Sequence, residues 1–151
     1  MPDKETIERA RKDERQGKAA STQAGEFVRE EMDHIREGKH GARSTKQAIA
    51  IGLSKARRAG VDLPVPKKRT ASVATRRKAK QDSKKGASGS SPSPRRSRAT
   101  SRALKREGSS AASPTALSRQ AHQAAKKRST SSRSAAARKA ARTRAREKAS
   151  G

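Results

Sequence analysis

Residues 21–53 read STQAGEFVREEMDHIREGKHGARSTKQAIAIGL, and the rest of the fold is organised around them. The first half of this stretch spaces apolar side chains three or four residues apart, which places them on one stripe of a helix. We predict that helix over residues 22–37, ending at Gly38, with Glu30, Asp33 and Glu37 largely outside the stripe. The stripe consists of Ala24, Phe27, Val28, Met32 and Ile35.

A second helix begins inside the same stretch. Ser44-Thr45-Lys46-Gln47 matches a capping box, in which the Ser44 hydroxyl and the Gln47 side chain satisfy each other's free backbone N–H groups. The helix is predicted over residues 45–59, and its Gly52 allows another helix to approach closely. We expect an antiparallel hairpin, whose contacts join Phe27 and Ile35 to Ile49 and Leu53.

A shorter helix is predicted before these two, over residues 4–16. It carries the favourable pairs Glu5–Arg9 and Glu8–Lys12, but Ile7 is its only large apolar residue, so we expect a loosely docked arm. The apolar core of such a module is small. We therefore expect residues 1–63 to be marginally stable alone and to form a homodimer or to gain stability from a ligand.

The composition changes after Leu63. Residues 1–63 carry 14 Lys and Arg against 11 Asp and Glu, whereas residues 64–151 hold the other 26 basic residues and only 3 acidic ones. Because this second part also holds only 4 of the 15 Ile, Leu, Val, Phe and Met residues, we predict a disordered basic tail in which helices can form over residues 97–107, 114–128 and 134–148. The predicted fold is mostly α: a helical hairpin or three-helix N-terminal module, followed by the tail.

The net charge of +26 points to a polyanionic partner, and double-stranded DNA is the partner we expect. The basic clusters of the tail can contact phosphates without reading bases. They are Lys67, Lys68, Arg69, Arg76, Arg77, Lys78, Arg95, Arg96, Arg98, Lys126, Lys127, Arg128, Arg138, Lys139, Arg142, Arg144 and Arg146. Within them, Ser93-Pro94-Arg95-Arg96 could form a turn that places two guanidinium groups in a narrow minor groove.

The loop before the second core helix is a further candidate for phosphate binding. Lys39, His40, Arg43 and Lys46 surround the predicted N-terminus of that helix, where free N–H groups and the helix dipole favour an anion. A flexible turn with solvated charges explains the same residues equally well.

Several classes of function are disfavoured by the residues that are present. The chain has no cysteine, and His34, His40 and His122 have no partner four residues away, so we predict solvated histidines, no metal site and no cofactor. Glu30 and Glu31 are neighbours on different helix faces, and no enclosed cavity is expected, so we predict that the protein is not an enzyme. No apolar run is long enough to span a bilayer, which favours a soluble, cytoplasmic protein associated with the nucleoid.

Residues 21–32 and 35–53 together resemble a family of small basic bacterial proteins known as a domain of unknown function. The resemblance covers roughly residues 4–63, implies a bacterial origin and brings no catalytic residues. The tail resembles in composition the tails of linker histones and of bacterial histone-like proteins.

The sequence thus favours a sequence-tolerant, histone-like DNA-binding protein. Two alternatives stay open. The helical module could dock on a DNA-repair or stress-response partner while the tail keeps it near DNA. The protein could also bind RNA or the ribosome, although it has no aromatic residues for base stacking beyond Phe27.

Overall fold

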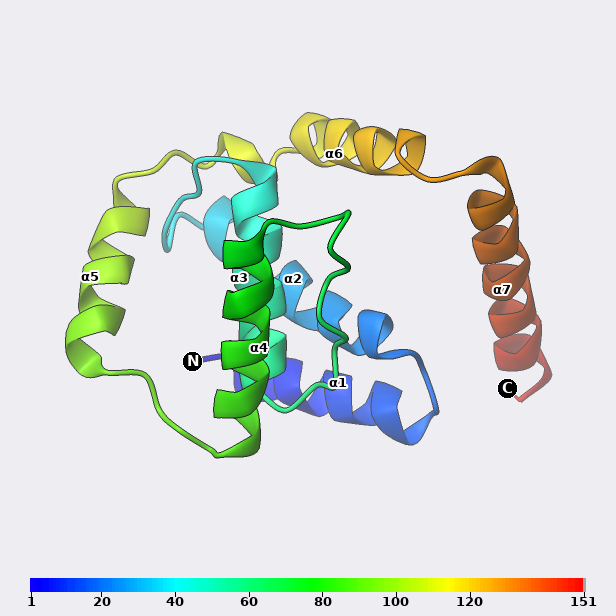
Figure 1. Ribbon diagram of the computed structural model, residues 1–151, viewed down its shortest axis with the longest axis horizontal. Helices are drawn as coiled ribbons and strands as arrows, with labels where there is room; N and C mark the ends of the chain where they lie inside the picture. The colour runs from blue at the N-terminus through cyan, green and yellow to red at the C-terminus, as the bar shows by residue number, and fades with distance from the viewer. Residues whose placement is uncertain (151) are drawn as a thin grey trace. The chain divides into compact units, whose positions relative to one another are not determined.

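The computed structural model describes residues 1–150 and contains no β-strand in that range (Figure 1). Its helices are α1 (Lys4–Arg15), α2 (Ala20–Arg36), α3 (Thr45–Arg58), α4 (Val73–Ala87), α5 (Pro94–Lys105), α6 (Pro114–Lys126) and α7 (Thr130–Ala149). The chain divides into two compact units, of which the first ends at Ser113 and the second begins at Pro114. The expectation of a mostly α fold is confirmed, whereas a disordered tail is not supported because α4–α7 lie within it.

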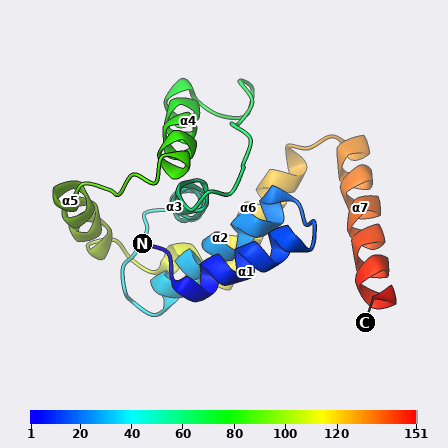
Figure 2. The same cartoon turned by 90° about the horizontal axis from the view of Figure 1, so that it is seen from below.

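Helix α1 is a full member of the core, so the expectation of a loosely docked arm is wrong. It runs antiparallel to α2, and the small residues Thr6 and Ala10 are buried in the contact (Figures 1 and 2). At the edge of the contact, Arg9 Nε donates to Glu26 Oε2 at 2.6 Å. Ile7 as the one large apolar residue of α1 is sufficient for packing against α2, because small side chains let the two helices approach closely.

Helix α3 crosses α2 steeply, so the two helices do not form the antiparallel hairpin that the sequence suggested (Figures 1 and 2). The crossing point is Gly52, where a Cβ would lie 2.7 Å from the Cα of Val28. A crossing at one close contact buries fewer residues along α3 than a hairpin would, and Ile49 accordingly remains partly exposed. The apolar cluster draws on α1, α2, α3 and the loop after α3, and consists of Ala10, Ala24, Phe27, Ala56 and Leu63 with Ile7, Ala20, Leu53 and Val61 packed against it.

Helix α4 was not expected, and it lies beside α3 in both views. The two helices run parallel, because the chain returns through residues 59–72 before α4 begins. Ser54 Oγ of α3 donates to Asp82 of α4 at 2.7 Å, and a Cβ at Gly86 would clash with the carbonyl group of Arg57. Ala79, Asp82 and Gly86 are spaced three and four residues apart, so α4 packs through a stripe of small residues.

Residues 104–112, called the strap below, close over the loop between α2 and α3. The backbone N–H groups of Gly41 and Ala42 donate to the carbonyl oxygens of Leu104 and Gly108 at 2.9 and 3.0 Å. Thr45 Oγ1 donates to the Ala111 carbonyl at 2.7 Å, and Arg36 Nε donates to the Ala112 carbonyl at 3.0 Å. The boundary after Leu63 therefore marks a change of charge, while packing continues to Ser113.

The remaining helices are largely exposed. All residues of α5 are exposed except Leu104, which is half-buried, and all residues of α7 are exposed except Ala136. No residue of α6 is buried. Helices α5–α7 lie within a few residues of the helices predicted at 97–107, 114–128 and 134–148. Within residues 1–150, no helix has the combination of length and apolarity that crossing a membrane requires.

Candidate functional site

Capping bonds from the chain itself take up part of the predicted phosphate site at the start of α3. The Ser44 side chain accepts a hydrogen bond from the Gln47 backbone N–H at 3.2 Å. The Gln47 side chain reaches back, but it accepts from the Arg43 backbone N–H at 2.7 Å, one residue before the position that the capping box predicts. The Thr45 hydroxyl is bonded to the strap, and of the first-turn backbone N–H groups it is the one of Gln47 that the Ser44 side chain caps, so phosphate binding here stays a prediction.

The basic residues around that turn point in different directions. Lys39 Nζ pairs with Glu37 Oε2 at 2.9 Å, and this bond raises the pKa of Lys39. Arg43 and Lys46 are exposed, whereas the His40 side chain is only 15% exposed and faces Glu31. The structure therefore does not gather Lys39, His40, Arg43 and Lys46 around one ligand.

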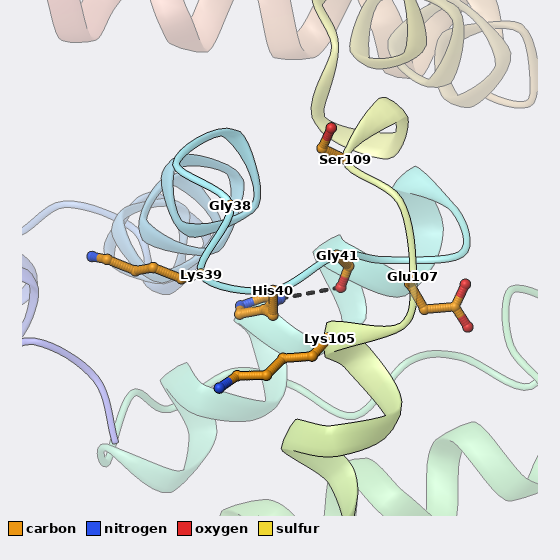
Figure 3. A pocket seen from close by; sticks show the side chains of 7 residues that line it. All are labelled: Gly38, Lys39, His40, Gly41, Lys105, Glu107 and Ser109. Atoms are coloured by element: carbon orange, nitrogen blue, oxygen red, sulfur yellow. Dashed lines mark hydrogen bonds between the residues drawn. The ribbon is translucent and has the colours of Figure 1, made fainter.

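A pocket lies where the loop meets the strap, and Figure 3 shows its lining. The loop contributes Gly38, Lys39, His40 and Gly41, and the other wall consists of Lys105, Glu107 and Ser109. The His40 ring points toward the loop and lies near Lys105, while the Glu107 carboxylate points away from the ring. The pocket is open to solvent along one edge of the loop.

The predicted DNA contacts of the tail lie on several different elements. Lys67, Lys68 and Arg69 are exposed in the loop before α4. On α4, Arg77 is exposed, Arg76 is half-buried and Lys78 pairs with Asp82. The predicted contacts at the end of α6 and on α7 are all exposed: Lys126, Lys127, Arg128, Arg138, Lys139, Arg142, Arg144 and Arg146.

Ser93-Pro94-Arg95-Arg96 forms the start of a helix, so it is not a free turn. Pro94 is the first residue of α5, where its fixed φ and missing N–H are well tolerated. Arg95, Arg96 and Arg98 are exposed on this helix, and no carboxylate pairs with its basic side chains within the described residues. Arg95 and Arg98 share one face of the helix, while Arg96 lies on another side, and all three charges are available to a ligand.

A buried cluster of charged residues lies at the contact between α2 and α3. Glu31 is fully buried and Glu30 is 5% exposed, although the sequence placed Glu30 largely outside the apolar stripe of the helix. Lys55 Nζ of α3 lies 2.8 Å from Glu31 Oε2 and 3.1 Å from Glu30 Oε1. Burial alone would lower the pKa of Lys55, but its contacts with Glu31 and Glu30 outweigh burial and raise the pKa above its ordinary value.

Two of the three histidines join this cluster, so the expectation that they are solvated is wrong for them. His40 Nε2 lies 3.3 Å from Glu31 Oε1, and His34 Nε2 lies 3.3 Å from Asp3 Oδ2. The two imidazole rings meet edge to face with centroids 6.0 Å apart. The backbone N–H of Asp3 donates to Glu30 Oε2 at 3.0 Å, which ties the N-terminus to the same place. His122, on α6, is exposed as expected.

Two patterns in the sequence could have indicated this cluster. Glu31 lies four residues after Phe27 and four before Ile35, which places it on the apolar stripe of α2. Glu31 and His34 are three residues apart and therefore share a helix face. Asp3, His40 and Lys55 reach the cluster from distant parts of the chain, and no local spacing indicates them.

Comparisons with known proteins support one part of the sequence analysis. Residues 3–69 match the model of a family of unknown function (DUF6496). The chain is thus similar to that family over α1–α3 and the start of the loop before α4. Neither the comparison with curated proteins nor the comparison with solved structures gives a match. The histone-like character of the tail stays a prediction.

Proposed function

We propose that the protein is a nucleoid-associated, histone-like DNA-binding protein that holds duplex DNA through its exposed basic helices and catalyses no reaction. The observation that carries the proposal is α7, which has seven basic residues, one acidic residue and no buried side chain. A helix with no face to bury derives little stability from packing within its own chain. An external polyanion would neutralise its like charges and favour the helix.

The distribution of charge on α7 fits a groove of duplex DNA. At 3.6 residues per turn, Arg138 and Arg142 share one face of the helix, whereas Arg144 lies on the opposite side. A helix is about 10–12 Å across and the major groove about 12 Å wide, so a helix in the groove has phosphates on both flanks. With 20 residues, α7 is about 30 Å long, close to one turn of the duplex.

Helix α5 offers a second contact of the same kind, with five basic residues and no acidic one. Both helices lack the Asn, Gln and aromatic residues with which proteins commonly read base edges. Arginine, which also reads base edges, is present on both. This composition supports binding that tolerates any sequence and depends steeply on salt.

The test compares two variants of the full chain that each lose four positive charges. In the first, Arg138, Arg142, Arg144 and Arg146 of α7 become Gln; in the control, the exposed Lys4, Arg11, Lys12 and Arg15 of α1 become Gln. Binding to duplex DNA is measured across a salt series. We expect the slope of log K against log salt to fall by about 3–4 in the α7 variant and by less than about 1 in the control.

If the slope of log K against log salt fell equally in the two variants, the proposal would be contradicted, because net charge alone would then explain binding. A structured RNA of equal phosphate content is added as competitor. If it displaces DNA at equal phosphate concentration, RNA binding replaces the DNA proposal.

A further inference from the structure

When the His40 ring is neutral, its hydrogen bonding leaves two lone pairs facing each other inside the protein. His40 Nδ1 lies 3.1 Å from the Gly41 carbonyl oxygen (Figure 3), and since a carbonyl can only accept, this nitrogen carries the proton. In the neutral ring, Nε2 is then an acceptor, and it lies 3.3 Å from the acceptor Glu31 Oε1. The carboxylate of Glu31 is fully buried, and its Oε1 accepts no hydrogen bond, whereas its Oε2 lies 2.8 Å from Lys55 Nζ. A cation between His40 Nε2 and Glu31 Oε1 would satisfy both.

The distance between these atoms is the one that a metal ion requires. Zinc binds imidazole nitrogen and carboxylate oxygen at about 2.0–2.1 Å, so two ligands of a tetrahedral ion are separated by about 3.3–3.4 Å. His34 supplies a third ligand from the next turn of α2, and one atom each of Glu31, His34 and His40 lies within 4.8 Å of the others. A shift of about 1 Å in a side chain brings the third ligand into range.

We infer that Glu31, His34 and His40 form a binding site for a divalent transition-metal ion of the zinc type. Two imidazoles and one carboxylate suit zinc and its neighbours better than magnesium or calcium, which prefer oxygen ligands alone. The hydrogen bond from His40 Nδ1 to a backbone carbonyl is the outer contact that commonly fixes a metal-binding histidine. Asp3 Oδ2, next to His34 Nε2, orients the second imidazole.

The charges around the site favour a divalent cation despite the net charge of the chain. Asp3, Glu30 and Glu31 contribute three negative charges, and Lys55 offsets one of them. With neutral imidazoles, two negative charges remain, and a divalent ion neutralises both. Lys55 lies against Oε2 of Glu31, which leaves Oε1 to the metal.

Such an ion would join the loop between α2 and α3 to the body of α2. Gly41 and Ala42, directly after His40, hold the strap through their backbone N–H groups. Metal binding at His40 would therefore stabilise the strap as well as the loop, and the Gly41 and Ala42 amides, which bind the strap and are not metal ligands, report on both.

The experiment titrates Zn²⁺ into full-length protein that has been dialysed against a chelator, and uses isothermal titration calorimetry. We expect one ion per chain, with binding weakened at least tenfold in His34→Ala and in His40→Ala. His122→Ala is the matched control, because it removes an exposed imidazole on α6 and should leave the affinity unchanged. Asp3→Asn should weaken binding roughly tenfold to a hundredfold, as loss of an outer partner does.

A second measurement keeps the test decisive if a variant unfolds. In the wild-type protein, Zn²⁺ should shift the NMR signals of the His34 and His40 rings and of the Gly41 and Ala42 amides, while the His122 signals stay in place. Equal affinity in all variants, or shifts at His122 alone, would overturn the site and leave only adventitious binding to a surface imidazole.

Discussion

Gly52 is the residue at which α3 and α2 approach most closely, and its lack of a side chain is required there. Replacing it with Ala would place a Cβ 2.7 Å from Val28 Cα, so the helices would have to move apart. We expect Gly52→Ala to lower the free energy of unfolding by about 1–3 kcal/mol in a urea titration.

Gly25 of α2 provides the control, because a Cβ there meets no atom within 4 Å and its φ is not positive. Gly25→Ala should raise the free energy of unfolding by about 0.5–1 kcal/mol, as expected for a helix interior. If both substitutions stabilise the protein, the close crossing at Gly52 is wrong.

Lys55 is the only ammonium group that contacts both buried carboxylates among the described residues. Lys55→Met would leave Glu30 and Glu31 buried side by side without it. We expect the free energy of unfolding to fall by about 3 kcal/mol. This value is at the lower end of the usual cost of breaking a buried ion pair, because the Lys55 side chain is 22% exposed. Lys46→Met, at an exposed position of the same helix, should change the unfolding free energy by less than about 0.5 kcal/mol.

Residue roles were predictable from the sequence where the partner is close along the chain. Ser44 caps α3 as predicted, and Phe27 lies in the core with Leu53 beside it. The roles of Glu30 and His40 were not predictable, because their partners come from another helix or from the N-terminus. A charged residue is assigned to the surface by default, and only a contact distant in sequence can make its burial favourable.

At the scale of the elements, α4 is docked chiefly by one buried carboxylate. Asp82 is 1% exposed and accepts from Ser54 Oγ, while Lys78 lies against its other oxygen. Asp82→Ala removes both contacts, and we expect α4 to open, with faster hydrogen exchange of its backbone amides than of those in α3.

Gln81→Ala is the control for that experiment, because Gln81 is exposed on the neighbouring position of α4. Its hydrogen exchange should match the wild type. Unchanged exchange in Asp82→Ala would mean that Ala79 and Gly86 alone hold the helix against α3.

The elements themselves were easier to predict than their packing. Periodic apolar residues and the capping box located α2 and α3 to within about two residues at either end. Helix α4 was missed because it packs through the small or polar residues Ala79, Asp82 and Gly86, which give no periodic pattern of large apolar residues. The crossing of α2 and α3 depends on Gly52, and a single glycine does not specify an angle.

At the scale of the whole molecule, stability should reside in the unit that ends at Ser113. Helices α6 and α7 contain no buried residue, so deleting residues 114–151 should change the unfolding free energy of the first unit by less than about 0.5 kcal/mol. Ending the chain after Leu63 instead removes α4 and the strap. The four hydrogen bonds of the strap alone correspond to about 4 kcal/mol, which urea unfolding of the two truncated chains would detect.

Homodimerisation of the helical module stays a prediction, and its physical basis has changed. It was inferred from a core of two helices, whereas the first unit also packs α1, α4 and the strap around that core. Sedimentation equilibrium at micromolar concentration checks it. A monomer with a single sharp unfolding transition above about 60 °C would contradict the prediction of a marginal module.

Because the strap is synthesised after the loop that it binds, the loop can complete its hydrogen bonds only late in folding. Its partner amides, at Gly41 and Ala42, leave the ribosome seventy residues before Ala112 does. At synthesis rates of 5–20 residues per second, the loop waits roughly 4–14 s for the segment that closes it. During that interval the basic helices α4 and α5 emerge beside ribosomal RNA, and under the proposed function this polyanion would compete for them before the first unit is complete.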